Sequence, residues 1–124
     1  MELVPLPHQV SVGGEYVGLR LKVAPYSIEG YDGFARIDVE LLTLHGHFRV
    51  RSEGYSPSEE LYAFANDSTR TSLEFQGFGP VKLRLSRIEP GNVRVELEFD
   101  SSEETISVEV DIFDRWEFEE WHGS

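Results

Sequence analysis

The chain contains no cysteine and one methionine in 124 residues. Without cysteine it forms no disulfide and no thiolate-bound metal site, which fits a reducing compartment. No apolar run approaches the roughly 20 residues of a membrane-spanning helix. The first residues lack the basic and apolar stretches of a secretion signal. We therefore expect a soluble, cytoplasmic protein without a membrane partner.

Motifs of common enzyme families are also missing. The sequence has no Gly-x-Ser-x-Gly elbow, and Gly77-x-Gly79 is followed by a strand pattern instead of the helix of a phosphate-binding loop. His45 and His47 stand close together, but the other histidines are remote, so we expect a polar turn and no metal. A hydrolase or isomerase that works with carboxylates would need an inward-facing acid, whereas the strand patterns place the acids outward. We expect no enzyme, no catalytic residue and no cofactor.

The negative charge is concentrated near the C-terminus. Residues 96–124 hold eleven of the 23 acidic residues but only one of the 11 basic residues, and the net charge of the chain is −12. Such a field attracts basic partners and repels nucleic acids and anionic membranes. Two tryptophans stand among these acids, and tryptophan anchors many protein interfaces. This pattern favours a basic protein partner and no nucleic acid.

We predict that this partner binds the acidic aromatic C-terminal segment. The candidate residues are Glu109, Asp111, Asp114, Trp116, Glu117, Glu119, Glu120 and Trp121. The alternative is that Trp116 and Phe118 complete the core while the glutamates face water. The spacing of the aromatic residues fits a strand or a helix, and we leave that choice open.

Apolar and polar residues alternate over most of the chain, which predicts β-strands. These segments are 17–23, 34–42, 48–51, 73–75, 81–85, 93–99 and 106–112. Residues 1–15 alternate weakly and fit an edge strand or an ordered arm, and residues 114–124 form the acidic aromatic tail. We predict one domain over residues 1–124: all-β with one short helix, as an antiparallel β-sandwich or a partly open barrel of about seven or eight strands.

The sequence predicts its single helix near Pro57. Ser56 precedes Glu59 by three residues, and the proline would occupy the first helical position, which is the pattern of a capping box. The apolar residues that follow have helical spacing: Leu61, Phe64 and Ala65. A helix of about ten residues is too short to be stable alone, so it must pack on a sheet or cap a barrel end.

The alternation also limits how the strands pair, because apolar residues must stay on one face. One allowed register sets Arg84 opposite Glu98 and Lys82 opposite Asp100. In the next hairpin, allowed registers set Arg94 opposite Glu109 or Asp111. Such cross-strand pairs stabilise a sheet by about 0.2–1 kcal/mol each. They involve few bases, so most of the acidic excess should remain unpaired.

A second function is suggested by aromatic residues around two predicted loops, 25–33 and 54–57. Tyr26, Tyr31 and Tyr55 lie in or beside these loops, together with Phe34. Such rings plug the ends of sandwiches or stack on sugars and peptides. The alternative function is therefore a small-ligand or carbohydrate-binding β domain.

The layout between residues 37 and 112 is similar to that of a known group. The segments that carry the similarity are Ile37 to Glu40, Gly46 to Val50, Ser58 to Leu61, Gly79 to Leu85, Val93 to Leu97 and residues 106–112. In these segments the chain resembles small bacterial immunity proteins of the WapI type. The resemblance implies a cytoplasmic inhibitor that neutralises a toxin domain delivered by a neighbouring cell, and it carries over no catalytic residue.

Overall fold

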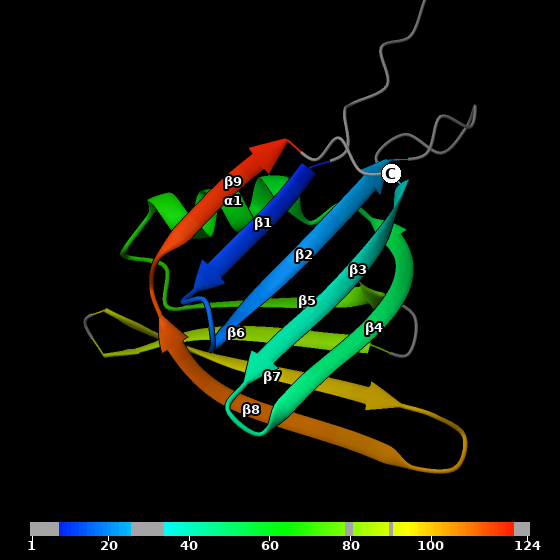
Figure 1. The fold of residues 1–124 in the computed structure, drawn as a ribbon. Helices are drawn as coiled ribbons and strands as arrows, with labels where there is room; N and C mark the ends of the chain where they lie inside the picture. The colour runs from blue at the N-terminus through cyan, green and yellow to red at the C-terminus, as the bar shows by residue number, and fades with distance from the viewer. Residues whose placement is uncertain (1–7, 26–33, 79–80, 90, 121–124) are drawn as a thin grey trace, which may run out of the picture.

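The computed structural model describes residues 8–25, 34–78, 81–89 and 91–120. Within these ranges nine strands and one helix form two packed layers (Figure 1). The elements are β1 His8–Gly13, β2 Gly18–Pro25, β3 Phe34–Thr43, β4 Gly46–Tyr55, α1 Ser58–Asn66, β5 Ser72–Phe78, β6 Val81–Glu89, β7 Asn92–Asp100, β8 Thr105–Phe113 and β9 Trp116–Glu120.

The strands form two antiparallel sheets. Sheet A has the order β4-β3-β2-β1-β9, and sheet B has the order β5-β6-β7-β8. The sheets cross face to face, and β8 at the edge of sheet B leads through a bend into β9 at the edge of sheet A (Figure 1). The predicted all-β antiparallel class is confirmed, and its arrangement is a β-sandwich.

The core lies between the sheets, where the inward side chains of alternate positions meet. Its fully buried members include Val10 of β1, Leu21 of β2, Leu83 of β6 and Val95 of β7. Each such side chain stabilises the fold by about 1.5–3 kcal/mol relative to an exposed position. Among the described residues, Ser52 is the one buried polar side chain.

The helix packs against β5 and β9, beside the end of the sandwich nearest β1 (Figure 1). Leu61 and Phe64 are buried, as their spacing predicts. The predicted capping box is wrong, because Pro57 itself takes the N-cap position and makes no side-chain cap bond. The helix begins one residue later than predicted, and the Ser56 hydroxyl lies 3.0 Å from that of Ser58 instead of capping Glu59.

One predicted strand register is wrong by two residues. Lys82 lies opposite Glu98, and Arg84 lies opposite Glu96, although the apolar residues keep their predicted face. The alternation determines which face the apolar residues take, but it does not determine the length of the turn. The turn is shorter than predicted, because Glu89 already pairs with Asn92. Gly91 has a φ of +87°, which side chains disfavour and glycine accepts. In the next hairpin Arg94 lies opposite Asp111, one of the two predicted partners.

Within the predicted N-terminal segment, β1 is not an edge strand, because it pairs with β2 on one side and β9 on the other. Residues 1–7 lie outside the described residues. Its hairpin to β2 requires glycine: Gly13 has a φ of +99°, and a Cβ there would lie 2.9 Å from the Cα of Gly18. The C-terminal segment over 116–120 is a strand, which settles the choice between strand and helix.

Beneath the helix, the side chain of Arg87 joins three parts of the chain. It donates to the backbone oxygens of Phe64 (2.6 Å), Asp67 (2.9 Å) and Arg70 (2.7 Å), at the end of α1 and in the loop that follows. Its Nε also donates to Asp114 Oδ2 at 2.9 Å, in the bend between β8 and β9. The guanidinium carbon lies 4.1 Å from the centre of the Phe64 ring, which adds a cation–π contact.

We expect Arg87→Ala to lower the free energy of unfolding by about 3 kcal/mol or more, because it leaves Asp114 and three carbonyls without their donor. Chemical denaturation followed by tryptophan fluorescence measures this loss. The matched control is Arg94→Ala, which removes an exposed arginine of sheet B and should cost far less. Equal losses for both variants would contradict a special role for Arg87.

Candidate functional site

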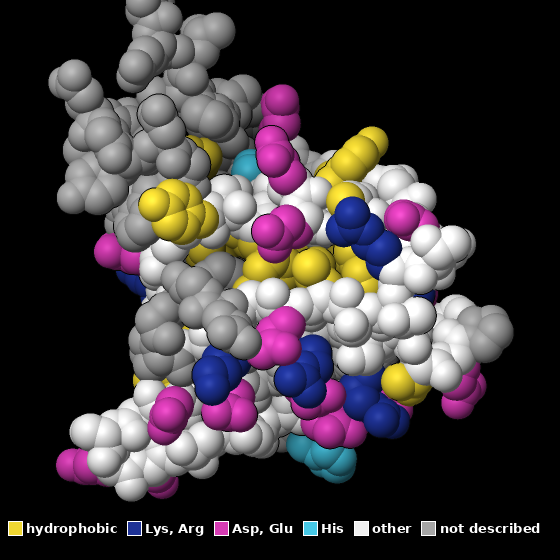
Figure 2. Space-filling view, turned by 180° about the vertical axis from the view of Figure 1, so that it is seen from behind, with side chains coloured by type: hydrophobic (Ala, Val, Ile, Leu, Met, Phe, Trp, Pro, Cys, Tyr) yellow, Lys and Arg dark blue, Asp and Glu magenta, His cyan; other side chains and the backbone are white. Residues whose placement is uncertain are grey.

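The structure divides the eight predicted partner-binding residues among several places. Glu109 and Asp111 lie on the outer face of sheet B, where they pair with Arg94 Nε at 3.2 and 2.9 Å. The hydrogen bond from Arg94 to Asp111 raises the pKa of the arginine above its usual value, so the base stays charged. Acidic and basic side chains are interspersed on the face seen in Figure 2. Both acids therefore belong to a paired sheet surface.

Asp114 and Trp116 hold the bend between the two sheets together. One Asp114 oxygen accepts from Arg87, and the other accepts from the indole Nε1 of Trp116 at 2.7 Å. Trp116 is half-buried, packs on the core and meets the Phe64 ring edge-on at 5.9 Å between ring centres. The alternative interpretation, in which Trp116 and Phe118 complete the core, therefore describes Trp116. Phe118 is partly exposed.

The three glutamates of β9 are exposed. Arg115 Nη2 approaches Glu117 Oε1 at 3.9 Å, the outer limit of an ion pair. No basic side chain of the described part of the chain forms an ion pair with Glu119 or Glu120. Trp121, the last predicted residue, lies outside the described residues. The acids of β9 thus carry negative charge that few neighbouring bases compensate.

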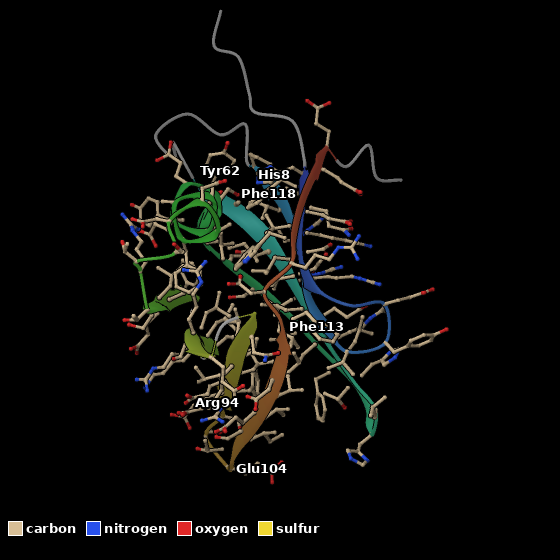
Figure 3. All side chains as sticks on the ribbon, turned by 90° about the vertical axis from the view of Figure 1, so that its left-hand side faces the viewer. His8, Tyr62, Arg94, Glu104, Phe113 and Phe118 are labelled. Atoms are coloured by element: carbon tan, nitrogen blue, oxygen red, sulfur yellow. The ribbon has the colours of Figure 1, made fainter. Side chains whose placement is uncertain are left out.

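An exposed aromatic pair lies beside these acids. Tyr62 of α1 and Phe118 of β9 meet edge to face, with 5.3 Å between ring centres. They are 59% and 38% exposed, and Phe118 also stacks on Trp116. Figure 3 shows both rings at one end of the molecule, far from Glu104 at the other. The sequence patterns did not predict Tyr62 as a site residue. It lies outside the apolar face of the helix that Leu61 and Phe64 define.

We call the surface formed by Tyr62, Phe118, Glu117, Glu119 and Glu120 the acidic aromatic edge. Strand alternation directs Phe118 toward α1, and it directs Glu117 and Glu119 to the opposite face of the strand. Two further exposed acids in the first turn of α1 extend the negative charge along the helix. His8 Nε2 is hydrogen-bonded to Ser58 Oγ, which joins β1 to the start of the helix.

This surface combines two features that are common in protein interfaces. Exposed aromatic rings supply apolar contact area, and acids around them favour a basic partner. The rings belong to regular elements that are packed on the core, so the pair is held in one arrangement. Such preorganisation lowers the entropic cost of association.

The histidine pair and the loop tyrosines, the other candidate sites, gather fewer suitable side chains among the described residues. His45 and His47 are exposed at the turn between β3 and β4, and within the described ranges no group of three or more His, Cys, Asp or Glu could hold a metal ion. Tyr55 is exposed at the end of β4, while Tyr26 and Tyr31 lie outside the described residues. The carbohydrate-binding alternative therefore stays a prediction. No helix in the described part of the chain is long and apolar enough to cross a membrane.

Comparisons with known proteins identify no relative: no protein-family model, no curated protein and no solved structure matches the chain. The resemblance to the WapI-type immunity proteins accordingly stays a prediction. The fold and the candidate site rest on the structure alone.

We expect Asp114→Ala to destabilise the fold by about 2 kcal/mol, because Arg87 and the Trp116 indole both lose their acceptor. Glu119→Ala removes the same charge from an exposed position of β9 and should leave stability nearly unchanged. Thermal or chemical unfolding of the two variants gives the comparison. A stable Asp114 variant would argue that this carboxylate is available to a partner after all.

Proposed function

We propose that the protein is a non-enzymatic inhibitor that binds and neutralises a basic bacterial toxin through the acidic aromatic edge. The observation that carries this proposal is the exposed pair of Tyr62 and Phe118 beside the glutamates of β9. A partner with a basic, partly apolar patch that wraps around the edge strand β9 would bury both rings and meet the acids on either face of the strand. The resemblance to immunity proteins points to the same class of function.

The charge of the chain supports such a partner. A net charge of −12 attracts a basic protein over a distance and orients it before contact. Many basic clefts bind nucleic acids, and an acidic surface can occupy such a cleft by resembling the phosphate backbone. The acids of β9 are arranged on both faces of an edge strand, so they are accessible from more than one side.

The interior supports binding rather than catalysis. Ser52 is the only buried polar side chain among the described residues, and none of the described carboxylates is buried. Catalytic acids and bases usually have pKa values shifted by burial or by close neighbours in a cleft. Hydrogen bonds from Thr69 lower the pKa of Asp67, and this carboxyl lies at the surface.

The first test is capture of a toxin followed by a growth assay. Immobilised protein is incubated with lysates of the producing organism and its competitors, and a retained basic protein is then expressed in sensitive cells. We expect that protein to stop growth and co-expression of the inhibitor to restore it. Replacing Glu117, Glu119 and Glu120 together by alanine should abolish both retention and rescue.

A variant with the same change in net charge is the matched control. Asp100→Ala, Glu103→Ala and Glu104→Ala remove three acids from the hairpin between β7 and β8, at the other end of the molecule (Figure 3). This control should retain the toxin and rescue growth. If both triple variants fail equally, net charge and not the acidic aromatic edge determines binding.

Once a partner is in hand, the aromatic pair and the charges should affect different rate constants. Tyr62→Ala should weaken binding by about tenfold or more, mainly through faster dissociation, because it removes an aromatic anchor. Added salt should slow association, because ions screen exposed charges beyond about 8–10 Å. Surface plasmon resonance measures both. An association rate that is indifferent to salt would contradict electrostatic attraction of the partner.

A further inference from the structure

The two sheets separate at the corner opposite α1, where the hairpin of β7 and β8 reaches past β4 (Figure 1). A cleft of about 470 Å³ opens between β4 and the inner faces of β7 and β8. Its apolar lining is Phe48, Val50, Leu97, Phe99, Ile106 and Val108. Phe48 is 37% exposed and Ile106 is 45% exposed, although strand alternation directs both into the sandwich. Part of the inner face of sheet B is therefore uncovered by the described residues.

One wall of this cleft is an edge strand. In the described part of the chain, β4 pairs with β3 and with no other strand. An edge strand presents backbone N–H and C=O groups that can pair with a further strand. A strand added to β4 would continue sheet A over the uncovered part of sheet B. It would then complete the second layer of the sandwich at this corner.

The side chains of β4 determine which strand fits. Phe48 and Val50 point into the cleft, whereas Arg49 and Arg51 point outward and are largely exposed. An added strand would alternate in the same way, so that its inward side chains meet the apolar lining. Its outward side chains would lie about 5 Å from those of β4, where opposite charges attract.

We infer that the cleft binds an extended segment of another protein that alternates apolar and acidic residues, by adding it as a strand to β4. Arg49 and Arg51 each make a short ion pair already, with Glu40 and Asp38 at 2.7 and 2.8 Å. A guanidinium has five N–H donors, so each arginine can bind a second carboxylate. This site lies away from the acidic aromatic edge and does not depend on the proposed function.

A second copy of this chain fits the cleft less well. Antiparallel pairing of residues 47–51 in two copies, with Phe48 and Val50 kept inward, sets His47, Arg49 and Arg51 of one copy against those of the other. Arg49 of one copy then faces Arg49 of the other, and these like charges repel. The edge strand β8 of a second copy also alternates apolar and acidic residues, although Arg94 already pairs with its two carboxylates. Self-association of the chain is the result that would indicate this occupant.

Two capped eight-residue peptides test the inference on the full chain. One alternates valine with glutamate, the other alternates valine with lysine, and each carries a fluorophore for anisotropy measurements. The net charge of −12 also attracts the lysine peptide to other surfaces, so the comparison counts only the binding that replacement of Arg49 and Arg51 changes. For that part we expect the glutamate peptide to bind at least about tenfold more tightly than the lysine peptide, because only its carboxylates attract the two arginines. Replacing both arginines by glutamine should remove this preference.

A substitution inside the cleft locates the site. Ile106→Asp places a charge on the apolar floor and should weaken binding of the glutamate peptide by about tenfold or more. Ile88→Asp is the matched control, because Ile88 is 37% exposed on β6 and does not line the cleft. Circular dichroism shows whether both variants are folded. If Ile106→Asp does not fold, the variant with both arginines replaced by glutamine still tests the inference.

Several results would overturn the inference. Equal binding of the two peptides would show that Arg49 and Arg51 do not select acidic side chains. Equal weakening by the two isoleucine variants would show that the peptide does not bind in the cleft. If neither peptide binds, the inference also fails. Analytical ultracentrifugation would then show whether wild-type protein self-associates and the Ile106 variant does not, which would assign the cleft to a second copy.

Discussion

The side chain of Arg87 is the contact on which the candidate site depends. It neutralises the carbonyl end of α1, holds the loop after the helix and fixes Asp114 in the bend between the sheets. Tyr62 is positioned by α1, and Phe118 is positioned by the strand that follows the bend. One guanidinium, with a side chain only 11% exposed, therefore keeps both halves of the aromatic pair in place.

The acidic residues of the chain have two different roles. On the sheet faces, arginines of neighbouring strands pair with them, as Arg94 does with Asp111 and Arg51 does with Asp38. On β9 such bases are scarce among the described residues, since Arg115 approaches only Glu117. Net charge alone does not distinguish these roles. The unpaired acids matter for a partner because their field is not cancelled locally.

The sequence predicted part of the candidate site. The glutamates of β9 were identified from their density, and the structure leaves them exposed. Asp114 and Trp116 belong to the same acidic aromatic run, but they face Arg87 and Phe64, which are remote in the sequence. Tyr62 was missed because one exposed tyrosine on a helix is unremarkable until Phe118 lies against it. Such long-range contacts have no local signature in the sequence.

The sequence by itself determined the fold class, the inward face of most strands and the buried face of the helix, because period-two and helical spacing are local properties. Only the tertiary structure decided the register of β6 and β7, the place of β1 between β2 and β9, and the strand conformation of residues 116–120. It also decided which acids find bases and where the sheets part to expose Phe48 and Ile106. These features depend on which distant segments meet, and the alternation of apolar residues is compatible with several such arrangements.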